Sequence, residues 1–235
     1  MDTRTRHALK KDSFAQAAAG SVSWLSGHRS DMLRWVVSAV VVVALAVGFA
    51  IYRSVRSSSA DQALGAALDV YTATLAQPGV TPAEGEYTSA EARSKEANRQ
   101  FVAIAHDYGW LPQGTKAHYF AGITDEDLGQ TGSAESELKI AAGSWNRNLS
   151  NLAKLALAGL YHRTARDGQA IELYNSLADR PSTTVSAAVA QLDLASLYAD
   201  QGKQDQARVL WAKVKDADKD GEAGAIAAQK LTAKQ

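Results

Sequence analysis

A pattern of small and large apolar residues occurs three times in succession in the C-terminal half of this chain. In each copy, two apolar stripes with the spacing of one helix face are separated by a short polar turn. The second stripe opens on Ala134, Ala170 and Ala207, so the copies step by 36 and then 37 residues. This period predicts stacked helical hairpins, because one hairpin cannot bury its apolar face alone. Stacked repeats of this kind typically provide surfaces that bind other proteins.

The last copy shows the physical basis of the pattern most clearly. Leu194 and Tyr198 are four residues apart, as are Ala207 and Trp211, so each pair lies on one helix face. Gly202, in the turn, suits the left-handed conformation that often ends a helix. The complete pattern is Ala121, Gly122, Gly129, Ala134, Leu138 and Ala141, then Leu157, Ala158, Tyr161, Ala170, Tyr174 and Leu177, then Leu194, Ala195, Tyr198, Gly202, Ala207, Trp211 and Val214.

These residues resemble the tetratricopeptide repeat over about residues 117–218. The family's first aromatic position is occupied instead by His118, Lys154 and Gln191, and only Pro181 lies near the position of the closing proline. The resemblance implies an all-α, tetratricopeptide-repeat-like solenoid of about three to four helical hairpins with a C-terminal capping helix. The alternative is an ordinary helical bundle.

A charge-free run of 18 residues extends from Trp35 to Tyr52. Its length is close to that of a membrane-spanning helix, and aromatic residues mark both ends, as is typical at a bilayer interface. Six Lys or Arg residues precede it, which favours a cytoplasmic N-terminus and a translocated remainder. The alternative, a cleaved signal peptide, is disfavoured by the long basic region before the run.

The net charge of zero is unevenly distributed. Residues 1–60 contain eight Lys or Arg and three Asp or Glu, whereas the remainder contains 17 basic and 22 acidic residues. A nucleic-acid-binding domain would have a basic folded part, so that class is disfavoured. The chain has no cysteine, which excludes a lipoprotein anchor and a disulfide framework.

We therefore predict four segments. A basic tail covers 1–33, a transmembrane helix 34–53, an irregular first hairpin with an inserted loop 58–112, and the repeats with their capping helix 113–235. Ser57–Ser59 is predicted to form a hinge. The first hairpin should contain helices over 60–76 and 88–108, and the capping helix should cover 223–231.

Two acidic motifs suggest chemistry, but each has a simpler interpretation. Asp216, Asp218, Asp220 and Gly221 match the first half of a calcium loop, yet Ala227 occupies the position of the closing carboxylate. The simpler interpretation is a polar loop whose aspartates cap the next helix. The run 125–127 should lie at the end of a helix, on a solvated face or in contact with a partner.

No motif predicts an enzyme, a metal site or a cofactor. His106, His118 and His162 lack the spacing of metal ligands, and there is neither a Gly-x-Ser-x-Gly elbow nor a glycine-rich phosphate loop. We therefore expect no catalytic residue, no cofactor and no small-molecule substrate.

In the tetratricopeptide repeat family, the first helix of each hairpin lines a concave groove. By resemblance, the partner-binding groove here would consist of Lys116, Tyr119, Ile123, Glu126, Leu152, Leu155, His162, Arg163, Val189, Leu192 and Ser196. Such a groove is mainly apolar and suits an amphipathic helix or a neighbouring folded domain. The alternative is that Leu155 and Leu192 belong to the core and the groove is smaller.

The basic tail, the single span and the degenerate repeats together resemble bacterial membrane proteins of the family that includes the ancillary subunit of the SecYEG translocon. The resemblance implies a single-pass protein of the bacterial inner membrane with a periplasmic repeat domain. It would act without catalysis, as an interaction scaffold for the Sec translocon, periplasmic chaperones or emerging chains. The alternative is a structural subunit of another envelope assembly complex, for outer-membrane or cell-wall biogenesis.

Overall fold

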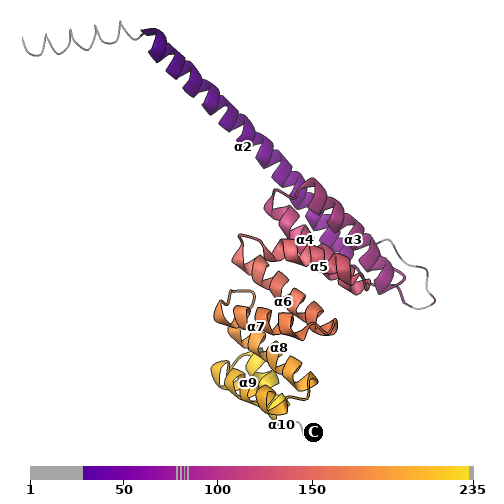
Figure 1. Cartoon of the computed structure of the whole chain (residues 1–235). Helices are drawn as coiled ribbons and strands as arrows, with labels where there is room; N and C mark the ends of the chain where they lie inside the picture. Colours follow the sequence, from indigo (N-terminus) through magenta and orange to yellow (C-terminus); the bar gives the residue numbers. More distant parts are fainter. Residues whose placement is uncertain (1–28, 78, 80, 82, 84, 233–235) are drawn as a thin grey trace, which may run out of the picture. The chain divides into compact units, whose positions relative to one another are not determined.

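The computed structural model describes residues 29–77, 79, 81, 83 and 85–232, and these residues contain helices but no strand. They belong to two compact units, one ending at Val55 and the other beginning at Arg56. The helices, labelled in Figure 1, are α2 (Arg29–Tyr71), α3 (Ala90–Asp107), α4 (Pro112–Asp127), α5 (Thr131–Ala142), α6 (Arg147–Arg163), α7 (Asp167–Asp179), α8 (Ala187–Asp200), α9 (Gln204–Ala217) and α10 (Glu222–Thr232). The predicted tail, 1–33, lies almost entirely outside the described residues.

In the first unit, the described part of α2 leaves its apolar side chains uncovered. Val42 and Leu45 are 64% and 69% exposed. Among the described helices, only α2 is long and apolar enough to cross a membrane, with a mean hydropathy of 2.5 over its most apolar window. Its exposed surface is therefore chemically suited to hydrocarbon rather than water.

The predicted hinge at Ser57–Ser59 is wrong, because α2 continues without a break to Tyr71. The hydroxyl of Ser57 accepts a hydrogen bond from the Gln113 side chain at 2.9 Å, and Ala60 is completely buried. Packing against α4 thus keeps this serine-rich stretch helical. The helix ends earlier than predicted, and Leu75 instead forms an isolated bridge with Tyr87.

In the second unit, each helix packs against the next one along the chain, as Figure 1 shows for α3 to α10. The last turns of α2 join α3 and α4 in the first core cluster, which contains Phe101. The largest cluster combines residues from α5 to α8, and a third one joins α8, α9 and α10. The helix predicted to cap the C-terminal end is present as α10.

Small residues allow the paired helices to approach closely. Ala134, Ala170 and Ala207, which begin the second stripe of each copy, are all completely buried. At Gly122, an added Cβ would lie 2.6 Å from Cγ of Leu138, so a larger side chain would push α4 and α5 apart. The repeat seen in the sequence is therefore also a repeat of interhelical packing.

The turn inside each hairpin has the same backbone geometry in all three copies. Gly129, Ala165 and Gly202 have φ angles of 72°, 57° and 74°. The following N–H groups of Gln130, Arg166 and Lys203 donate to the carbonyl oxygens of Asp125, Tyr161 and Tyr198, each at 2.8 Å. This is the hydrogen bond of a Schellman-type helix end. In the second copy an alanine adopts the left-handed conformation, which costs about 1 kcal/mol.

The acidic loop before α10 acts as a helix cap. The carboxylate Oδ2 of Asp218 accepts a hydrogen bond from the N–H of Gly224 at 3.1 Å, and this N–H lies in the first turn of α10, where it has no partner within the helix. No group of three metal-binding side chains occurs anywhere in the described part of the chain. Asp218 therefore has the role of a helix cap, the simpler of the two interpretations of this acidic motif.

Candidate partner-binding groove

A groove of about 410 Å³ lies on the first helices of successive hairpins. It is lined by Tyr119, Ile123 and Glu126 of α4, by Leu152, Leu155, Ala156, Gly159 and Arg163 of α6, by Tyr174 of α7 and by Asp193 of α8. Six of these ten residues were predicted from the sequence. The volume falls within the range of binding pockets, about 300–1,000 Å³.

Helix periodicity places these side chains on one wall. Tyr119, Ile123 and Glu126 are spaced by four and three residues, so they form one face of α4. The groove residues of α6 follow the same rule. Ala156 and Gly159 carry little or no side chain, and an added Cβ at Gly159 would lie 3.2 Å from Nη1 of Arg163. The small residues thus leave room for the Arg163 side chain to lie along α6.

An ion pair crosses the groove between its two main helices. The Arg163 guanidinium of α6 donates to Oε1 of Glu126 on α4. The Glu126 side chain is 27% exposed and that of Arg163 is 55% exposed. The pair therefore connects α4 and α6 at the solvent-facing rim, where it contributes at most about 1 kcal/mol, and each partner largely compensates the charge of the other.

Four of the ten groove residues were not predicted from the sequence, and Asp193 is the charged one among them. It is half-buried and has no hydrogen-bond or ion-pair partner among the described residues. Burial raises the pKa of its carboxyl group. Burial, followed by the nearby Asp193 charge, raises the pKa of the Tyr174 hydroxyl to about 12. The available signal was the one acidic residue of α8 before its last residue, placed between Leu192 and Leu194.

Five of the predicted groove residues lie outside this groove. Lys116 is exposed on α4, and Val189 is half-buried near the start of α8. Leu192 packs with the cluster around Trp211, and the Ser196 hydroxyl donates to the Leu192 carbonyl at 3.1 Å. Leu155 has both roles, since it lines the groove and contacts the core. The groove thus contains six of the eleven residues predicted from the family resemblance.

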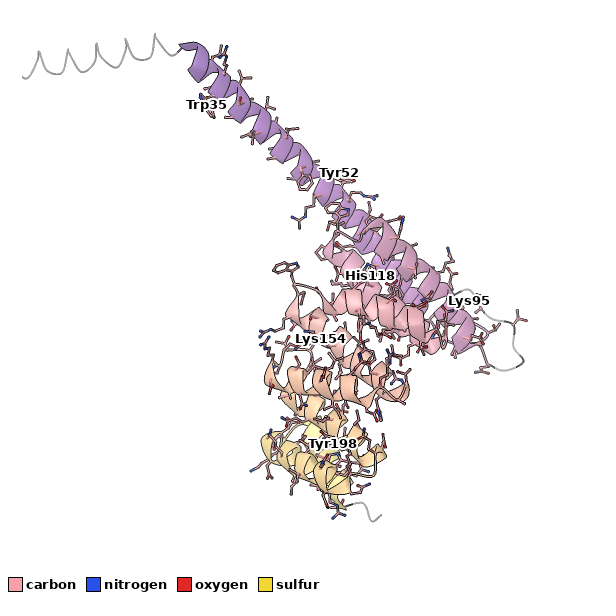
Figure 2. All side chains as sticks on the ribbon, in the orientation of Figure 1. Trp35, Tyr52, Lys95, His118, Lys154 and Tyr198 are labelled. Carbon is pink, nitrogen blue, oxygen red and sulfur yellow. The ribbon has the colours of Figure 1, made fainter. Side chains whose placement is uncertain are left out.

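His118 and Lys154, which occupy the aromatic position of the repeat that the sequence resembles, are labelled in Figure 2 on α4 and α6. The His118 ring is within 2.5 Å of Oε2 of Glu137, so this position ties α4 to α5 by a polar contact instead of aromatic packing. Neither residue lines the groove.

The acidic run 125–127 ends α4, as predicted, but of its three residues only Asp127 is exposed. Asp125 is only 3% exposed, and its Oδ1 accepts a hydrogen bond from the Asn98 side chain at 2.7 Å. Burial raises its pKa. The Ser94 hydroxyl donates to Asp127 at 3.1 Å. The run therefore joins α4 to α3, while its middle residue, Glu126, faces the groove.

His162 links three helices beside the groove. Its Nδ1 lies 2.7 Å from Oδ1 of Asp167, at the start of α7, and its Nε2 lies 3.2 Å from Oδ2 of Asp200, at the end of α8. Because both neighbours are carboxylates, the protonated ring can donate from both nitrogens. The hydrogen bond to Asp167 is the main cause that raises the pKa of His162.

Replacing His162 with Gln should therefore reduce stability more in mild acid than in alkali. The folded-state pKa is raised, so the stabilisation is complete below the usual pKa of 6.5 and is lost as the pH rises through the raised pKa. Asp167, whose pKa is lowered by His162, stays ionised throughout this window. We expect a difference of up to about 1 kcal/mol at about pH 5.5 that shrinks towards about pH 9.

Urea unfolding of both proteins at several pH values measures this difference. His106→Gln is the control, because the His106 side chain is 87% exposed at the end of α3. A difference between wild type and His162→Gln that does not change with pH would contradict the role of the charged ring.

Searches of protein-family models, curated proteins and solved structures found no match to this chain. What the groove binds is therefore inferred from its own shape and chemistry.

Proposed function

We propose that this protein is a membrane-anchored interaction scaffold without catalytic activity. The apolar part of α2 holds it in a bacterial inner membrane, and a tetratricopeptide-repeat-like domain binds a segment of another protein in its groove. The observation that carries the proposal is that six side chains chosen from the repeat pattern line one groove on successive hairpins.

The composition of the groove favours a peptide segment over a small metabolite. Ile123, Leu152 and Leu155 offer apolar surface, whereas the polar groups belong to the Glu126–Arg163 pair, to Asp193 and to two tyrosines. Helices with one apolar face bind in grooves of this kind through residues spaced by three and four. The proposed occupant is therefore an amphipathic helix of a partner protein.

The charge distribution supports a periplasmic repeat domain. Basic residues are concentrated before the apolar run, and the excess of acidic residues follows it, which is the asymmetry of a span with its N-terminus in the cytoplasm. A domain in this position would meet translocon subunits, chaperones and emerging chains, the partners that the family resemblance suggests.

A second candidate function is that of a permanent subunit of another envelope complex. Three exposed apolar side chains outside the groove favour it. Trp145 is completely exposed in the loop between α5 and α6, Val209 on α9 is 68% exposed, and Ile140 on α5 is 51% exposed. Permanent interfaces bury apolar surface of this type.

Photo-crosslinking in cells distinguishes the two functions. A photoreactive amino acid would replace Tyr119 or Leu155 in the groove, Trp145 or Val209 outside it, and the exposed Glu172 on α7 as a control. Adducts with translocon subunits, chaperones or nascent chains at the groove positions alone would support the scaffold.

One dominant adduct at Trp145 or Val209, with a stoichiometric partner, would instead support the structural subunit. Groove positions that crosslink no more than Glu172 would refute the proposed binding site.

A further inference from the structure

The charges in the groove do not balance. Two carboxylates, Glu126 and Asp193, face it together with one guanidinium, that of Arg163. The guanidinium is already bound to Glu126. The groove as it stands therefore carries one excess negative charge, located at Asp193.

The partly buried carboxylate of Asp193 lowers the stability of the folded protein. The Asp193 side chain is half-buried at the groove, where burial raises the pKa of the carboxyl group, and no donor among the described residues forms a hydrogen bond with this carboxylate. A carboxylate that is partly removed from water without a partner destabilises the folded protein. Because Asp193 lines an open groove rather than the closed core, a ligand can supply the missing donor.

We propose that the groove selects peptide segments that present a lysine or arginine side chain beside apolar residues, with Asp193 accepting hydrogen bonds from the cationic group. This inference rests on the proposed function and specifies the class of partner. The apolar side chains of the segment pack against Ile123 and Leu155, and its basic side chain reaches the α8 end of the groove.

Other ligand classes fit less well. An anionic group would meet the excess negative charge, and Arg163, the one cation among the described residues that line the groove, is bound to Glu126. A metal ion needs several ligands, and no cluster of three metal-binding side chains exists in the residues that the structure covers. A neutral apolar segment would leave the Asp193 carboxylate buried and unpaired, which lowers affinity.

The test uses the full-length protein in lipid nanodiscs and pairs of fluorescent amphipathic peptides. Each pair has an identical apolar face, and its members differ only in one central residue, which is lysine in one and norleucine in the other. Fluorescence anisotropy measures both dissociation constants. We expect the lysine peptide to bind about tenfold more tightly than its norleucine partner, as a hydrogen bond to a charged group implies.

Three variants assign this preference to Asp193. In Asp193→Asn, which keeps the size of the side chain, the preference for lysine should disappear, and in Asp193→Glu it should largely remain. Asp179→Asn is the matched control, because Asp179 is exposed at the end of α7 and does not line the groove. Thermal unfolding of each variant verifies that the protein is folded.

Two results would overturn the inference. Wild-type protein could bind both peptides equally well, or Asp193→Asn could keep the preference for lysine. A further variant, Leu155→Glu, separates this failure from that of the proposed function, once thermal unfolding has verified that this variant is folded, because Leu155 also contacts the core. If it abolishes the binding of both peptides, the groove is the binding site and only the charge selection is wrong. If peptide binding is absent or survives Leu155→Glu, the proposed function fails as well.

Discussion

Replacing Phe101 with Ala is expected to lower the free energy of unfolding of the second unit by about 3–5 kcal/mol. Phe101 is completely buried between α2, α3 and α4. Its ring stacks on Phe120 with 5.1 Å between centroids and meets the edge of Tyr71 at 6.3 Å. Removing it loses apolar burial and both ring contacts, and it leaves a cavity that neighbouring helices cannot easily fill.

Chemical denaturation followed by circular dichroism measures this loss. Val102→Ala is the matched control, because the adjacent Val102 side chain is 42% exposed and should change stability by less than about 1 kcal/mol. Equal effects of the two substitutions would show that the first hairpin does not contribute to the stability of the repeats.

The double substitution of Val42 and Leu45 by Asp should prevent the protein from integrating into the membrane. Both residues lie in the middle of the charge-free run and are exposed along α2. An aspartate near the centre of a span costs about 2.5–3.5 kcal/mol, so the pair should cost about 5–7 kcal/mol. This cost exceeds the favourable free energy with which a span of barely sufficient length inserts into the membrane. The protein should therefore be found in the soluble fraction or be degraded.

Carbonate extraction of membranes measures integration. The control is the double variant Ser58→Asp, Gln62→Asp, in which two aspartates are introduced outside the charge-free run. This variant should remain in the carbonate-resistant membrane fraction. A Val42→Asp, Leu45→Asp protein that also resists carbonate would contradict the assignment of this run as the anchor.

Patterns within one helix could be predicted from the sequence. The buried alanines Ala134, Ala170 and Ala207, the turn glycines Gly129 and Gly202, and the apolar run are all local features. They can be predicted because backbone hydrogen bonds set the period of every helix, so residues three and four apart share a face. The phase taken from the family resemblance selected six of the residues that line the groove.

The rotation of α8 could not be predicted. The family resemblance directed Val189, Leu192 and Ser196 into the groove, whereas the structure directs Asp193 there and packs Leu192 against the α9–α10 core. Adjacent residues on a helix differ in direction by about 100°. If the helix is assumed to be rotated by one residue, an apolar side chain such as Leu192 is placed in the groove instead of the Asp193 carboxylate.

Distant contacts explain the other differences. The serines at 57–59 lie within α2, and the first of them accepts a hydrogen bond from Gln113, more than fifty residues away. Asp125 is buried because Asn98 of the preceding helix binds it. Local composition by itself determined which segments form helices and where their apolar faces lie. Only the tertiary structure decided which polar side chains those faces enclose, because that depends on partners brought close by the packing of other helices.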